Sequence, residues 1–129
     1  MKLIILYPED LMPITIDTAK KIIFIDYSNM NPEQLITEAE KVHNEGIRAR
    51  SSGMKVKVFV DVRGTYLNPE SVKALKDITK KDNDIVEKTA IVGITGLKRI
   101  LADAIAAFSG TKTKYFDTKE QAIEWLSQP

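Results

Sequence analysis

Short apolar runs separated by polar turns predict the strands of this chain. Lys21–Tyr27 is apolar almost throughout, which indicates a strand buried on both faces of a sheet. Lys55–Val62 alternates, so that Val56, Val58 and Val60 fall on one face. The predicted strands are Leu3–Tyr7, Lys21–Tyr27, Lys55–Val62, Thr89–Ile94 and Thr113–Phe116, with Ile14–Ile16 as a short extension.

Amphipathic segments follow the later strands, and each begins with a helix-capping residue. Asn31 and Asn68 are each followed by Pro and Glu, and Pro suits the first position of a helix. The Ser51–Gly53 stretch ends the first helix, and Gly110 ends the third, whose apolar stripe spans Leu97–Phe108. The predicted helices begin after Asn31, Asn68, Thr95 and Thr118.

The resulting order of elements is β-β-α-β-α-β-α-β-α. Strands separated by single helices pair in parallel through right-handed crossovers. We therefore expect an α/β fold, with a sheet of about five strands, mostly parallel, packed with about four helices. No linker or repeat divides the chain, so residues 1–129 are expected to form a single domain.

Composition excludes several kinds of chemistry. The chain has no Cys and one His, so disulfides, thiolate nucleophiles, Cys-ligated zinc and His-rich metal sites are excluded, and we expect no metal or cofactor. With 19 basic and 18 acidic residues, the net charge of +1 provides no field for nucleic acid, and no nucleic-acid partner is expected. The apolar run at Leu3–Tyr7 is too short for a signal peptide, which favours a cytoplasmic protein.

The C-terminal third carries a family resemblance. Residues 88–101 (KTAIVGITGLKRIL) form a strand, a small-residue turn with Gly-Leu and the start of an apolar helix. The pattern continues through Ala106–Gly110 to Phe116–Leu126, with a Phe-Asp-Thr cap and a Trp-Leu ending. This pattern, with the order of elements, resembles the STAS domain superfamily, and most closely its SpoIIAA-like (STAS/SEC14) branch of small stand-alone prokaryotic proteins.

The resemblance implies a module that acts by binding partners rather than by catalysis. STAS domains are sometimes switched by phosphorylation within an Asp-Ser-Ser/Thr-Gly-Leu motif after the third strand. The corresponding segment here is Asp61–Tyr66 (DVRGTY), in which Val62 and Arg63 replace the expected hydroxyl residues. Thr65 and Ser71 are the nearest substitutes and the candidate phosphorylation sites. The SEC14-like label implies a second function, the binding of a lipophilic ligand against the sheet.

Two segments at strand ends are candidate sites on chemical grounds. Ligands of open parallel sheets gather at the carboxyl ends of strands, where Asp61–Gly64 is expected to lie. Gly93–Arg99 combines two glycines, the free amides of a helix start and two cations, a combination that can hold phosphate or carboxylate. Its spacing is not that of a P-loop. The structural alternative is that Asp61 caps its loop, Gly93 permits close packing and Thr95 is a plain helix cap. The candidate binding residues are Asp61, Arg63, Gly64, Thr65, Tyr66, Gly93, Thr95, Gly96, Lys98 and Arg99.

Other residues give weaker indications. His43 has no evident acid or nucleophile partner in the sequence, so a catalytic role is not expected. Asp26 ends its strand as Asp61 does, and two carboxylates at one edge could do acid–base work, although capping of loops is the simpler role. Met30 is apolar where a polar loop is expected, which indicates either an interaction patch or a cover for the core.

The expected function is a non-catalytic regulatory or ligand-sensing binding module whose site is the edge formed by Asp61–Tyr66 and Gly93–Arg99. One alternative is a carrier of a small lipophilic ligand, held between the sheet and the helix of Leu97–Phe108, with at most peripheral membrane contact. Another is a binder of a phosphorylated metabolite at Gly93–Arg99. The partner is thus a protein or a small anionic or lipophilic molecule, and a homodimer is left open.

Overall fold

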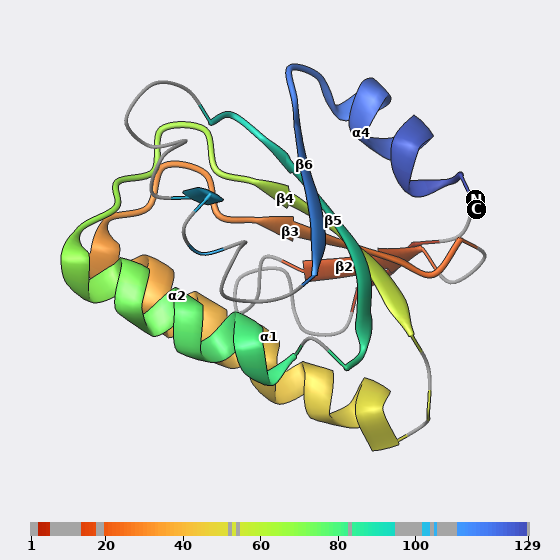
Figure 1. Cartoon of the computed structure of the whole chain (residues 1–129), viewed down its shortest axis with the longest axis horizontal. Helices are drawn as coiled ribbons and strands as arrows, with labels where there is room; N and C mark the ends of the chain where they lie inside the picture. Colours follow the sequence, from red (N-terminus) through yellow and green to blue (C-terminus); the bar gives the residue numbers. More distant parts are fainter. Residues whose placement is uncertain are drawn as a thin grey trace.

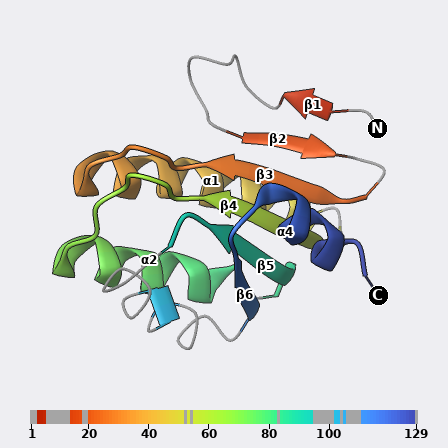
Figure 2. The same ribbon diagram turned by 90° about the horizontal axis from the view of Figure 1, so that it is seen from above.

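A computed structural model of the chain describes residues 3–5, 14–17, 20–51, 53, 55–82, 84–94, 102–103, 105 and 111–128. Its strands form one sheet in which spatial order follows sequence order (Figures 1 and 2). The strands are β1 (Leu3–Ile5), β2 (Ile14–Asp17), β3 (Ile22–Asp26), β4 (Val56–Asp61), β5 (Val86–Val92) and β6 (Lys112–Phe116). Neighbouring strands from β3 to β6 are parallel, whereas β1 and β2 pair in an antiparallel manner at one edge.

This architecture confirms the predicted α/β fold with a mostly parallel sheet, and two strand predictions need correction. The predicted extension at Ile14–Ile16 is a complete strand, Ile14–Asp17, because it pairs with both β1 and β3. The strand predicted from Thr89 begins at Val86. Glu87 and Lys88 near its start are charged and hide the pattern, and a register shift between Val56 and Lys57 of β4 accommodates them in the ladder.

Three helices are described in full: α1 (Pro32–Ser51), α2 (Pro69–Lys81) and α4 (Lys119–Leu126). Each begins at the predicted cap. Asn31 and Gln34 bond each other's backbone amides at 2.8 and 3.0 Å, and Thr118 accepts from the amide of Gln121 at 3.2 Å. The helix predicted after Thr95 lies largely outside the described residues, of which Ala102, Asp103 and Ile105 are helical.

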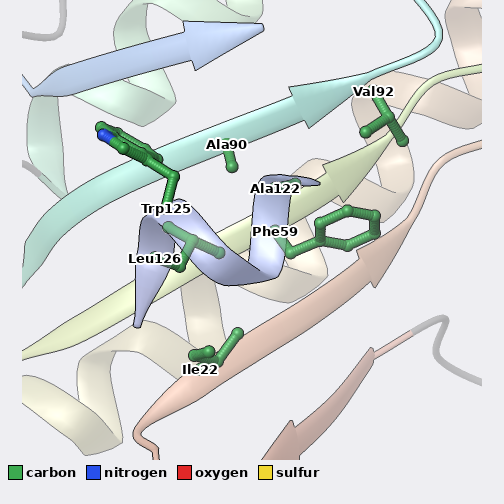
Figure 3. Close-up of a cluster of buried hydrophobic side chains, with 7 residues drawn as sticks. All are labelled: Ile22, Phe59, Ala90, Val92, Ala122, Trp125 and Leu126. Atoms are coloured by element: carbon green, nitrogen blue, oxygen red, sulfur yellow. The ribbon is translucent and has the colours of Figure 1, made fainter. Parts of the chain in front are cut away.

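Two apolar clusters hold helices on opposite faces of the sheet (Figure 1). One cluster joins Val56 and Val58 of β4 to Leu35 and Ala39 of α1, as the alternation in β4 predicted. The other lies between the sheet and α4 (Figure 3), where the helix contributes Ala122, Trp125 and Leu126. Full burial of an aliphatic side chain stabilises a fold by roughly 1.5–3 kcal/mol, so this packing fixes a helix too short to form alone.

No helix in the part of the chain that the structure describes is long and apolar enough to cross a lipid bilayer.

Candidate functional site

The loops that follow β3, β4 and β5 meet at one edge of the sheet, as the parallel topology requires. We call this edge the carboxyl rim, defined by residues 26–30, 61–66 and 93. Backbone hydrogen bonds extend the sheet into this rim. The Tyr27 amide donates to the backbone carbonyl of Asp61 at 2.8 Å, and the Val62 amide donates to the backbone carbonyl of Val92 at 3.0 Å. Beyond the strands, the amide of Asn29 donates to the carbonyl of Arg63 at 2.8 Å. The loop after β4 is therefore fixed between its two neighbours.

Asp61 and Arg63 form a chelated ion pair in this loop. Nε of Arg63 donates to both carboxylate oxygens of Asp61 at 3.1 Å, and Nη2 donates to Oδ2 at 2.7 Å. The Arg63 amide also donates to Oδ1 at 3.0 Å. The pair orients the guanidinium while leaving the Arg63 side chain 73% exposed.

The pKa values of both groups follow from this pairing. Burial raises the pKa of the Asp61 carboxyl, but hydrogen bonds from Arg63 and the charges of Arg63 and Lys119 outweigh burial and hold it below its ordinary value. The hydrogen bond to Asp61 in turn raises the pKa of Arg63, and the charge of Asp26 adds to that effect. Asp61 is therefore a carboxylate, and Arg63 a cation, throughout the neutral range.

Asp26 and Asp61 are neighbours across the β3–β4 ladder, as their matching positions suggested. Each carboxylate accepts hydrogen bonds from its own loop: Asp61 from Arg63, and Asp26 from the amide of Ser28 at 2.9 Å. Loop capping is the role that these contacts show.

Thr65 and Gly64 fix the turn of the same loop. The Thr65 hydroxyl donates to the carbonyl of Tyr27 and accepts from the amide of Met30 at 3.1 Å. Gly64 has φ +71°, and a Cβ atom there would lie 2.2 Å from Oδ1 of Asn29. Met30 packs against the cluster beneath α1. Of its two interpretations, an interaction patch and a cover for the core, this contact favours the cover.

The candidate phosphorylation sites lie inside the fold. Thr65 is 2% exposed, and its hydroxyl is hydrogen-bonded to the Tyr27 carbonyl and the Met30 amide. Ser71 is completely buried and forms the capping box of α2, with its hydroxyl accepting from the amide of Asn68 at 2.9 Å. Phosphorylation of either residue stays a prediction, and a kinase would need the segment to open locally.

Gly93 lies beside Arg63, so the structure brings together the first residue of the second candidate segment and the loop after β4. Thr95, Gly96, Lys98 and Arg99 lie outside the described residues, as does most of the helix expected to cover a lipophilic pocket. Anion binding at 93–99 and the lipophilic carrier therefore stay predictions.

Tyr66 is the last residue of the rim loop after β4 and is 72% exposed. Its backbone is nevertheless fixed, because its amide donates to the carbonyl of Met30 at 3.1 Å. Among the residues that the structure describes, no large hydrophobic side chain other than that of Tyr66 is exposed.

The sequence interpretation missed a partner for His43. Nδ1 of His43 lies 2.7 Å from Oδ1 of Asp82, and this contact joins α1 to the C-terminal cap of α2. Asp82 occurs in a charged stretch that the pattern predicts as a solvated turn, so nothing in the sequence marks it as the partner. Within the described ranges, no cluster of three His, Asp or Glu side chains could hold a metal ion.

Comparison with known proteins agrees with this architecture. No curated protein matches the chain. An uncharacterised protein from Shewanella loihica PV-4 with a SpoIIAA-like fold superimposes with a TM-score of 0.55 at 16% identity, covering 81% of each chain. At this identity, the similarity establishes the fold alone. The SpoIIAA-like family profile matches residues 22–127, which is most of the chain. The chain therefore belongs to the SpoIIAA-like family.

Proposed function

We propose that the chain is a non-catalytic binding module that uses the carboxyl rim to bind a protein partner. The observation that carries this proposal is the exposure of Arg63 and Tyr66, at 73% and 72%, on a loop whose backbone is held on both sides. The family supports the same class of function, since STAS-type modules act by binding.

Arg63 and Tyr66 have the chemistry that dominates protein interfaces. Arg and Tyr are enriched among interface residues whose truncation costs most affinity, because each combines a large contact area with directional hydrogen bonds. Asp61 bonds Nε and Nη2 of Arg63, so Nη1 is not engaged by this carboxylate and can donate to a partner's carbonyl or carboxylate.

The fixed loop lowers the entropic cost of binding. The Thr65 hydroxyl and the carbonyl of Met30 hold the backbone of the loop, and the ion pair with Asp61 holds the Arg63 guanidinium, before a partner arrives. Ordering a flexible side chain at an interface costs roughly 0.5–1.5 kcal/mol, and here part of that cost is met by the fold. The partner is expected to present an acceptor for Arg63 and an apolar surface for the Tyr66 ring.

Site-specific photo-crosslinking in the native host tests the proposal. A photoreactive phenylalanine derivative replaces Tyr66 in one variant and Lys73, an exposed residue of α2, in the control. We expect one discrete crosslinked protein from position 66 that is lost when Arg63→Ala is added and absent from position 73. The same products from both positions, or crosslinking unaffected by Arg63→Ala, would contradict the proposal.

A further inference from the structure

Four lysines gather at the end of the sheet opposite the carboxyl rim. Lys57 of β4 pairs with Lys88 of β5, and Lys88 pairs with Lys112 of β6. Residues paired across neighbouring strands lie on one face, about 4.8 Å apart. Lys114, two residues further along β6, falls on the same face. We call these four residues the lysine row.

Three lysines of the row, Lys88, Lys112 and Lys114, lie around the indole of Trp125 in α4. Nζ of Lys88 lies 5.0 Å from the ring centroid, Nζ of Lys112 lies 5.9 Å from it and Nζ of Lys114 lies 5.6 Å from it. Lys88 is buried, and its Nζ donates to the carbonyls of Trp125 at 3.3 Å and Gln128 at 2.9 Å. Lys88 therefore fixes the end of α4, whereas Lys112 and Lys114 are exposed.

In the described part of the chain, no carboxylate forms an ion pair with a lysine of the row. Carboxylate partners are found elsewhere: Lys41 pairs with Glu38, His43 with Asp82 and Arg63 with Asp61. Burial, and then the charges of Lys112 and Lys57, lower the pKa of Lys88, although the nearby charge of Glu87 acts in the opposite direction.

Such an arrangement opposes folding. Like charges placed directly opposite each other on neighbouring strands are destabilising, and the contacts with the Trp125 ring act in the opposite direction. An anion bound from solution would remove the repulsion.

We propose that the lysine row is a binding site for an anion that carries two or more phosphoryl groups. Each ammonium is a compact, strongly hydrated charge with three donors, and each phosphoryl group offers concentrated negative charge and several acceptor oxygens. Lys57, Lys112 and Lys114 contact the anion, while Lys88 positions Trp125 beneath it. A row of cations fits linked phosphoryl groups better than a single carboxylate, which would neutralise one lysine alone.

The site can be tested with a built-in probe, because Trp125 is the sole tryptophan of the chain. Its fluorescence is titrated with inorganic tripolyphosphate at about 0.15 M salt, where weak surface attraction is largely screened. We expect a saturable change, with affinity at least about tenfold lower in Lys112→Gln/Lys114→Gln. The control Lys73→Gln/Lys80→Gln removes the same charge from α2 and is expected to bind like the original chain.

A second arm identifies the source of the phosphoryl groups. Sedimentation with phosphatidylcholine vesicles, with and without cardiolipin, tests a lipid headgroup that carries two phosphoryl groups. Binding to tripolyphosphate supports a free anion and binding to cardiolipin vesicles supports a headgroup, provided that Lys112→Gln/Lys114→Gln weakens that binding at least about tenfold. Absence of binding in both arms, equal loss in the α2 control, or tighter binding of a thymidine oligonucleotide than of either probe would overturn the proposal.

Discussion

Gly93 lies directly against Arg63: a Cβ atom at position 93 would lie 2.4 Å from Cγ of Arg63 and 2.7 Å from its backbone nitrogen. Gly93 also has φ +90°, a conformation that residues with side chains rarely adopt. Next to this contact, the Val62 amide donates to the carbonyl of Val92. The loop that displays Arg63 is thus positioned by a glycine at the end of the neighbouring strand.

Replacement of Gly93 by Ala is expected to lower the free energy of unfolding by about 3 kcal/mol, since backbone strain adds to the clash with Arg63. Gly53→Ala is the matched control, because Gly53 has φ +73° but no atom within 4 Å of the added Cβ. It is expected to lose about 1 kcal/mol from strain alone. Urea unfolding measures both, and equal losses would show that contact with Arg63 is unimportant.

Thr65→Val is expected to destabilise the fold by about 2 kcal/mol. The new side chain has nearly the same shape but leaves the Tyr27 carbonyl without its donor and the Met30 amide without its acceptor. Thr79→Val makes the same chemical change in α2, where the hydroxyl adds a bond to the Leu75 carbonyl, and should cost less than about 0.5 kcal/mol. Similar unfolding free energies for the two variants would argue against a structural role for the Thr65 hydroxyl.

The ion pair between Asp61 and Arg63 predicts a specific pH dependence. The pKa of the Asp61 carboxyl is lower in the folded chain than its unfolded value of about 3.9, so the unfolded chain takes up the proton first as pH falls. The stabilisation is complete above that unfolded pKa and is lost as pH falls through the folded pKa. Asp61→Asn should therefore show a shallower loss of stability below about pH 4 in urea unfolding series. Superimposable pH profiles would contradict the pairing.

His43 and Asp82 are expected to be energetically coupled across α1 and α2. Their hydrogen bond of 2.7 Å involves a carboxylate, and such bonds contribute about 1.5–3 kcal/mol. A double-mutant cycle compares His43→Gln, Asp82→Asn and the double variant. The sum of the two single losses in the free energy of unfolding should exceed the loss in the double variant by about 1 kcal/mol. Additive losses would mean that the contact contributes nothing of its own.

Local sequence patterns predicted most of the fold. Apolar runs located the parallel strands, and the caps at Asn31, Asn68 and Thr118 located the starts of the described helices. The start of β5 was missed because Glu87 and Lys88 interrupt its apolar pattern, and their place in the sheet depends on pairing with β4. Strand pairing is a long-range property that periodicity within one segment does not encode.

Some features of the candidate sites follow from the order of elements, whereas others depend on long-range packing. Parallel topology was enough to bring Asp61–Tyr66 and Gly93 to one edge. The contact between His43 and Asp82 depends on how two helices pack, and the lysine row depends on the register of three strands, so neither could be read from spacing along the chain.

The most direct test of the central claim is the affinity of the purified partner, once it has been captured at position 66, for variants of the carboxyl rim. Isothermal titration calorimetry should show at least about tenfold weaker binding for Arg63→Ala and for Tyr66→Ala than for the original chain, with Lys73→Ala unchanged. Binding of both rim variants within about twofold of the original chain, with their folds intact, would contradict the assignment of the carboxyl rim as the binding surface.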